Sequence, residues 1–194
     1  SFDFAIKMKL LKHNPMTEII MPKRKKIRTE NYWTVQELQE FLNIVLQEEP
    51  YKHYALFRLL AYSGLRKGEL YALKWADIDF QSEALSISKS LGRLDGQAVE
   101  KGTKNNFSVR KIKLDSETIS ILQEWKSNCQ KEKAQLAVAP LSIEQDFIFT
   151  YCTRTGSIEP LHADYINNVL SRIIRKHGLR KISPHGFRHT HATL

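Results

Sequence analysis

The sequence changes its hydrophobic period twice, and this change constrains the fold more than any other feature. From Leu38 to Leu46, apolar residues recur every three or four positions, which is the pattern of a helix that buries one face. Leu85-Ser86-Ile87-Ser88 then alternates like a half-buried strand, and 109–114 does so less strictly. Beyond Asp115 the helical spacing returns. The sequence therefore predicts an α+β fold, mainly helical, with a small antiparallel sheet of about three strands.

The expected helix ends have local signals. Thr34 and Glu37 form a capping box, which predicts the start of one helix. The next should end at Ser63-Gly64, because glycine accepts the left-handed conformation, and a short helix should follow from Lys67 to Leu73. Asp115-Ser116 is expected to cap a long helix. The other expected segments are a helix end at 2–12, a buried run at 147–149, a helix at 161–177, and turns at Gly92, Gly96, Gly102 and Asn105-Asn106.

Composition narrows the class of protein. The 194 residues are 42% hydrophobic, enough for one good-sized domain with a real core. The net charge of +9 favours a polyanionic partner such as nucleic acid; a membrane surface is the other candidate, although no apolar stretch is long enough to span a bilayer. Two cysteines, Cys129 and Cys152, are too few for a disulfide scaffold or a cysteine zinc site. We expect reduced thiols in a cytosol.

A basic run lies in the expected linker before the helix that starts at the capping box. Five of its six residues are cationic: Lys23, Arg24, Lys25, Lys26 and Arg28. Such a run can be a solvated, disordered segment. Its position before a folded domain also makes it a candidate strap that follows a DNA backbone.

The first candidate anion site is Gly64-Leu65-Arg66-Lys67-Gly68-Glu69-Leu70. Arg66 comes just after one helix and at the head of the next, where free backbone N–H groups and a guanidinium can bind an anion. Glu69 is three residues further on the same face and can orient Arg66. The plainer alternative is an ordinary surface ion pair.

Two further segments carry cations suited to phosphate. Lys104 is expected at a hairpin turn, where it can donate a proton or clamp a phosphate, or be an ordinary exposed lysine. Near the end, Ser183 is expected to cap a helix with Pro184 in its first turn. His185 and Arg188 would then share one face, and an imidazole beside a fixed cation suits an anionic centre. The alternatives are a core histidine and a surface cation.

The sequence around and after His185 contains neither a standard set of metal ligands nor a tyrosine that could act as a nucleophile. His185, His189 and His191 could be called a metal cluster, but no carboxylate or cysteine accompanies them and their spacing fits no standard ligand set. Phosphoryl transfer without a metal needs a nucleophile and a clamp for the oxyanion. All seven tyrosines precede His185.

In this order the segments resemble the tyrosine recombinases, the phage-integrase family. The resemblance covers nearly the whole chain and rests on an ordered set of short motifs: Gly64-Leu65-Arg66-Lys67-Gly68-Glu69-Leu70, Leu73-Lys74-Trp75 with Asp77-Ile78-Asp79, Thr103-Lys104 before Arg110-Lys111-Ile112-Lys113-Leu114, and His185-Gly186-Phe187-Arg188-His189-Thr190. It implies a site-specific recombinase of a phage or integrative element. Such an enzyme breaks and rejoins DNA through a 3′-phosphotyrosyl intermediate, without metal or ATP.

The resemblance also implies roles for single residues. Arg66 and Arg188 would hold the non-bridging oxygens of the scissile phosphate, with Glu69 supporting Arg66. His185 would donate a hydrogen bond and carry a proton, and Lys104 would protonate the departing 5′ oxygen. The family's nucleophile is a tyrosine beyond the second arginine. These 194 residues contain none there, so we expect the fragment to be inactive.

The implied organisation places the end of a core-binding domain and its basic linker at 1–30, and a catalytic domain, truncated before the nucleophile, at 31–194. The partner would be double-stranded DNA, with a homotetramer on DNA for the full-length protein and a monomer for the fragment. The expected location is the cytoplasm of a bacterial or phage-infected cell, near the nucleoid. A non-catalytic DNA-binding module or regulator is the alternative function. A type IB topoisomerase relative is less favoured by the Glu69-Leu70 and 185–189 patterns.

Overall fold

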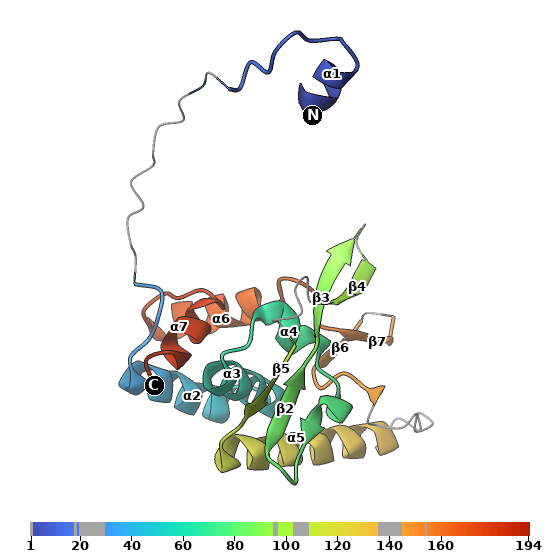
Figure 1. Ribbon diagram of the computed structural model, residues 1–194. Helices are drawn as coiled ribbons and strands as arrows, with labels where there is room; N and C mark the ends of the chain where they lie inside the picture. The colour runs from blue at the N-terminus through green and yellow to red at the C-terminus, as the bar shows by residue number, and fades with distance from the viewer. Residues whose placement is uncertain are drawn as a thin grey trace.

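The helices and strands follow the predicted change of hydrophobic period (Figure 1). The structure is a computed structural model that describes residues 2–17, 19, 30–94, 97–102, 109–135, 145–153 and 155–194. Its helices are α1 (Phe2–Lys7), α2 (Val35–Glu48), α3 (Tyr51–Ser63), α4 (Lys67–Ala72), the 3-10 helix η1 (Trp75–Asp77), α5 (Ser116–Gln135), α6 (Tyr165–His177) and α7 (Gly186–His191). Its strands are β1 (Ile78–Asp79), β2 (Ala84–Ile87), β3 (Lys89–Leu94), β4 (Gln97–Gly102), β5 (Arg110–Lys113), β6 (Thr150–Cys152) and β7 (Ile158–Pro160).

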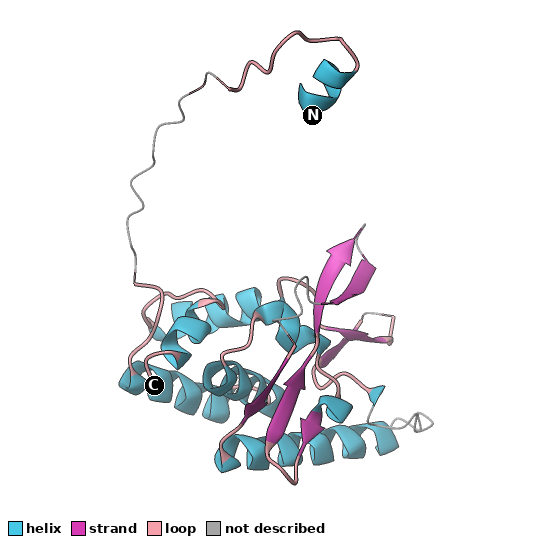
Figure 2. Cartoon of the chain, viewed as in Figure 1, coloured by secondary structure: helices cyan, strands magenta, loops and turns pink. Residues whose placement is uncertain are grey.

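The main sheet is the predicted one. Strands β1, β2 and β5 form a three-stranded antiparallel sheet in that order, with Leu85 opposite Ile112 and Ile87 opposite Arg110. Helix α5 contacts α3, and helices α2, α3, α6 and α7 lie together on one side of this sheet (Figure 2). The predicted α+β class, mainly helical with a small sheet, is confirmed.

The predicted helix signals are present where they were expected. The Glu37 N–H donates to Thr34 Oγ1 at 3.3 Å and the Thr34 N–H donates to Glu37 Oε2 at 2.7 Å, so the capping box starts α2. Gly64 ends α3 with a φ of 61°, in the left-handed region. Asp115 Oδ1 accepts the Thr118 N–H at 2.9 Å at the start of α5. Within the described ranges, no helix combines the length and apolarity needed to cross a membrane.

Two predicted helices have different bounds. Helix α1 ends at Lys7, short of the expected residue 12, and Lys9 nearby has a φ of 57° that is incompatible with a continuing helix. Helix α6 begins at Tyr165, later than the expected residue 161, and the preceding Ile158–Pro160 is extended and paired with Thr150–Cys152 as β7.

The β3–β4 hairpin was not predicted. We expected turns at Gly92 and Gly102, but both lie inside strands, with Gly92 opposite Val99 and Gly102 opposite Lys89. Glycine is unfavourable in a strand interior unless another part of the chain approaches closely. Strand β3 packs against α4, and the close approach between them is at Gly68 of α4, where an added Cβ would lie 2.5 Å from Ser90 Oγ.

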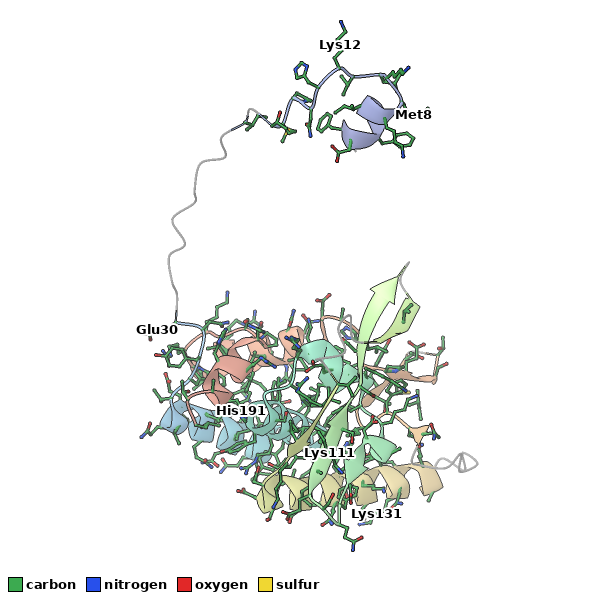
Figure 3. The ribbon with its side chains drawn as sticks, viewed as in Figure 1. Met8, Lys12, Glu30, Lys111, Lys131 and His191 are labelled. Atoms are coloured by element: carbon green, nitrogen blue, oxygen red, sulfur yellow. The ribbon has the colours of Figure 1, made fainter. Side chains whose placement is uncertain are left out.

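An aromatic cluster connects the C-terminal helix to the rest of the core. Trp33, Phe41, Phe57 and Phe187 are essentially inaccessible to solvent, and their ring centroids lie 4.7 to 5.8 Å apart. These rings come from the segment before α2 and from α2, α3 and α7. The side chains of this helical part are drawn in Figure 3. Burying four large aromatic residues together fixes α7 against α3.

Candidate functional site

Arg66 lies in the three-residue connection between α3 and α4. Its backbone N–H donates to Glu69 Oε2 at 2.9 Å, and its Nη1 donates to Glu69 Oε1 at 3.0 Å. The Arg66 side chain is 56% exposed, whereas that of Glu69 is 3% exposed. The predicted contact is therefore present: a buried carboxylate holds an exposed guanidinium at the start of a helix.

Arg110, the first residue of β5, binds the same carboxylate. Its Nη1 lies 3.0 Å from Glu69 Oε1 and its Nη2 lies 2.8 Å from Glu69 Oε2. From the sequence, Arg110 was predicted only as part of a strand-like motif, with no role in the site. The available signal was weak: a cation at an inward-facing position of a short alternating strand.

The electrostatics of Glu69 reflect these contacts. Burial by itself raises the pKa of the Glu69 carboxyl, but hydrogen bonds from Arg110 and from Arg66 outweigh it and hold the pKa at about 2. The hydrogen bonds between Arg110 and Glu69 in turn raise the pKa of Arg110. Glu69 is thus a fixed negative charge near neutral pH.

Arg188 reaches the same turn from α7. Its Nη1 donates to the Gly64 carbonyl oxygen at 2.7 Å, which joins residues 124 positions apart. The ring of His191 lies against Gly64, where an added Cβ would be 2.6 Å from His191 Cδ2. The structure therefore brings both predicted arginines to the short segment 64–66.

His185 is the residue before α7, and its ring is exposed. The ring packs edge-on against His189, with centroids 4.9 Å apart. Within the part of the chain that the structure describes, the His185 side chain makes no hydrogen bond, so its nitrogens are open to a ligand. The expected cap is wrong: α7 begins at Gly186, and Ser183 instead bonds Asn31.

Helix α7 is positioned by the segment that leads into α2. Asn31 Oδ1 accepts the Ser183 N–H at 2.7 Å, and Asn31 Nδ2 donates to Ser183 Oγ at 2.9 Å. The buried hydroxyl of Thr190 accepts the Trp33 N–H at 2.9 Å and donates to the Gly186 carbonyl at 3.1 Å. These bonds, together with the aromatic cluster, fix the helix that carries Arg188.

The remaining predicted residues lie outside the described residues. They are Lys104 and the basic run, Lys23, Arg24, Lys25, Lys26 and Arg28.

The described residues are suited to binding an oxyanion. Arg66 and Arg188 present guanidinium groups around one turn, and His185 adds an exposed imidazole at the residue before α7. Guanidinium groups bind phosphate oxygens through paired hydrogen bonds as well as charge. Among the described residues, no group of three or more histidine, cysteine, aspartate or glutamate side chains is arranged to hold a metal.

Sequence comparison gives one family and several relatives. Residues 31–194 match the phage integrase family. The ICEBs1 integrase of Bacillus subtilis (strain 168) is 28% identical over 196 residues, which cover 100% of this chain and 50% of the relative. The integrase of Staphylococcus phage L54a is 26% identical over 174 residues, covering 84% of this chain and 47% of the relative. The chain thus spans about half the length of the curated relatives it matches.

Solved structures share the fold. The Tn1549 transposon integrase in complex with circular intermediate DNA matches with a TM-score of 0.76 and 23% identity, covering 98% of this chain and 62% of that one. The XerH site-specific recombinase bound to its difH substrate matches with a TM-score of 0.60 and 23% identity, covering 100% and 50%. At 23% identity, these two matches show a shared fold and not a shared function.

Proposed function

The chain belongs to the phage integrase family, and we propose that residues 31–194 form the phosphate-binding part of the catalytic domain of a site-specific DNA recombinase. The observation that carries this proposal is the meeting of two arginines at one turn. Arg66 is held there by Glu69, and Arg188 donates to the Gly64 carbonyl from α7. Two guanidinium groups fixed in this way suit a phosphodiester, whose two non-bridging oxygens share one negative charge.

In the proposed reaction the protein stabilises the transition state mainly by charge. Arg66 and Arg188 would each bind a non-bridging oxygen, and His185 would donate a further hydrogen bond. The oxygen of a tyrosine from outside these 194 residues would bond to phosphorus and pass its proton to His185 as the bond to the 5′ oxygen breaks. Lys104 would protonate that departing oxygen. The resulting 3′-phosphotyrosyl bond retains the energy of the phosphodiester, so rejoining would be the reverse step.

We also propose a domain organisation, a DNA partner and an oligomeric state for this protein. Residues 1–30 would be the end of a core-binding domain and a linker whose basic run contacts the DNA backbone. Double-stranded DNA would be the partner, with a homotetramer on DNA for the full-length protein and a monomer for the isolated 194 residues. The DNA-bound relatives and the net charge of +9 support a DNA partner. The site of action would be the nucleoid of a bacterial or phage-infected cell.

Trapping of a covalent adduct tests the proposal. The full-length protein from the natural open reading frame is incubated with nicked duplexes that tile the DNA junctions flanking its gene, and adducts are resolved on denaturing gels. We expect an adduct with the full-length protein and at least a 100-fold lower yield for Arg66→Ala and Arg188→Ala. Lys131→Ala, which removes an exposed cation on α5, is the matched control (Figure 3).

Two outcomes would contradict parts of the proposal. DNA binding by the full-length protein without any adduct would favour the non-catalytic DNA-binding module. An adduct formed by the 194-residue polypeptide alone would show that the nucleophile is one of the tyrosines before His185. Mass spectrometry of the linked peptide would identify that tyrosine.

A further inference from the structure

We propose that Arg110 is a positioning residue: as the counter-ion of Glu69, it leaves the positive charge of Arg66 available to the DNA phosphate. The inference rests on the proposed function. It gives a role in the reaction to a strand residue that does not itself need to reach the DNA.

The geometry ranks Arg110 as the stronger partner of Glu69. Arg110 binds both carboxylate oxygens through Nη1 and Nη2, which is the bidentate arrangement that orients a guanidinium best. Arg66 contributes only Nη1 from its guanidinium, together with its backbone N–H. Within the described residues, the other guanidinium nitrogens of Arg66 make no hydrogen bond. They are therefore free to bind a phosphate oxygen.

The charges explain why a second arginine is needed. Glu69 is nearly inaccessible to solvent, so water screens its charge poorly and its pairing with nearby cations is strong. With Arg66 as its only partner, the carboxylate would neutralise that guanidinium and compete with the phosphate for it. Arg110 supplies a second positive charge, so the three groups together carry one net positive charge. Because Arg110 is less exposed than Arg66, that charge is offered to a ligand through Arg66.

The position of Arg110 is fixed by the sheet and does not depend on a ligand. Arg110 pairs with Ile87 in the β2–β5 ladder, and Ile87 is buried in the core. The strand thus sets the distance from the Arg110 backbone to the first turn of α4. A small change at this end of β5 would move Glu69 and Arg66 together.

Single-turnover cleavage by the full-length protein tests the inference. The variants are Arg110→Met, Arg110→Lys and the double variant Glu69→Gln with Arg110→Met, with Lys113→Met as a control for the same charge change on the exposed side of β5. For Arg110→Met we expect a roughly 10- to 100-fold slower cleavage at saturating DNA, with a DNA dissociation constant changed by less than about 3-fold. Arg110→Lys should recover part of the rate, because it keeps the charge but not the paired geometry.

The double variant separates charge balance from structural support. If Arg110 acts by balancing Glu69, removing both charges frees Arg66, and the double variant should cleave faster than Arg110→Met. A double variant as slow as or slower than Arg110→Met would overturn the inference, as would an Arg110→Met rate equal to that of Lys113→Met. A methylphosphonate at the cleavage point, which removes one phosphate charge, should shrink the effect of Arg110→Met; an unchanged ratio would also overturn it.

Failure of the inference and failure of the proposed function give different results. A wild-type protein that forms no adduct contradicts the proposed function. A wild-type protein that cleaves normally while Arg110→Met and Arg110→Lys do the same contradicts only the inference. Thermal unfolding of each variant confirms that the comparison is made between folded proteins.

Discussion

Gly64 serves the site through its backbone conformation and through its lack of a side chain. Its φ of 61° turns the chain out of α3, and its carbonyl oxygen accepts the hydrogen bond from Arg188. The His191 ring occupies the space where a Cβ would be. The sequence predicts the first property, because glycine after an apolar helix is a known ending. The other two depend on a helix more than 120 residues later.

Gly64→Ala should therefore be more destabilising than a glycine replacement that causes backbone strain alone. The left-handed conformation costs a non-glycine residue about 1–2 kcal/mol, and the His191 ring must also shift. Gly178→Ala is the matched control, because Gly178 has a φ of 66° but no atom within 4 Å of an added Cβ. In urea unfolding, Gly64→Ala should lose more free energy of unfolding than Gly178→Ala. Adding His191→Ala to the Gly64→Ala chain should remove this difference. Equal losses at the two glycines would contradict the close contact.

The depressed pKa of Glu69 predicts an acid-dependent stability. The carboxyl has a pKa of about 2 in the folded chain against an ordinary value of 4.5, so its ionised form is favoured by folding. This contribution is complete above about pH 4.5 and is lost as the pH falls toward 2; its full size is on the order of 3 kcal/mol. The measurement is the free energy of unfolding of wild type and Glu69→Gln between pH 7 and 3. The difference between them should shrink below about pH 4.5, and a difference independent of pH would contradict the assignment.

At the scale of elements, helix α7 depends on the segment before α2. The Thr190 hydroxyl accepts the buried Trp33 N–H. Thr190→Val keeps nearly the same side-chain volume but leaves this donor unpaired, which should lower the free energy of unfolding by about 1–3 kcal/mol. Amide hydrogen exchange at Trp33 should accelerate in Thr190→Val. Thr190→Ser, which keeps the hydroxyl, should leave that exchange rate near wild type. Fast exchange in both variants would mean that packing and not the hydrogen bond holds the segment.

The elements predicted well are those with local signals. The capping box at Thr34, the glycine after α3 and the alternation of β2 each depend on residues a few positions apart. The β3–β4 hairpin was missed because its glycines look like turn residues, although Gly92 and Gly102 both pair within the ladder. The start of α7 was also misplaced, because Ser183 is engaged by Asn31 from a distant segment.

Within the site, too, a contact between residues close in the sequence could be predicted, whereas a contact between distant residues could not. Arg66 and Glu69 are three residues apart, so their contact could be predicted from helical geometry. Arg110 is 41 positions from Glu69, and its side chain differs little in the sequence from the exposed cations Lys111 and Lys113 beside it. The one signal in the sequence, the alternation of a short strand, is too weak to select the strand cation that faces the buried carboxylate.

At the scale of the whole molecule, the net charge of +9 predicts DNA binding that weakens with salt. The logarithm of the association constant should fall linearly with the logarithm of salt concentration, by about 0.9 for each phosphate neutralised. Replacing the five cations of the basic run by alanine should reduce this slope by up to about 4. Fluorescence anisotropy with a labelled duplex at several salt concentrations measures the slope. Lys131→Ala should change it little, and an unchanged slope in the five-residue variant would exclude the run as a DNA contact.

The hydrogen bond from Arg188 to the Gly64 carbonyl also governs when the site can exist during synthesis. Chains are made from the N-terminus, and segments can begin to fold as they leave the ribosome. Helices α2 to α4 and the main sheet emerge long before α7, so Arg66, Glu69 and Arg110 can assemble first. The second guanidinium arrives only when residue 188 has emerged. A nascent chain thus has only half of the proposed phosphate clamp, and cannot hold a DNA phosphate between two arginines, until α7 has emerged and docked.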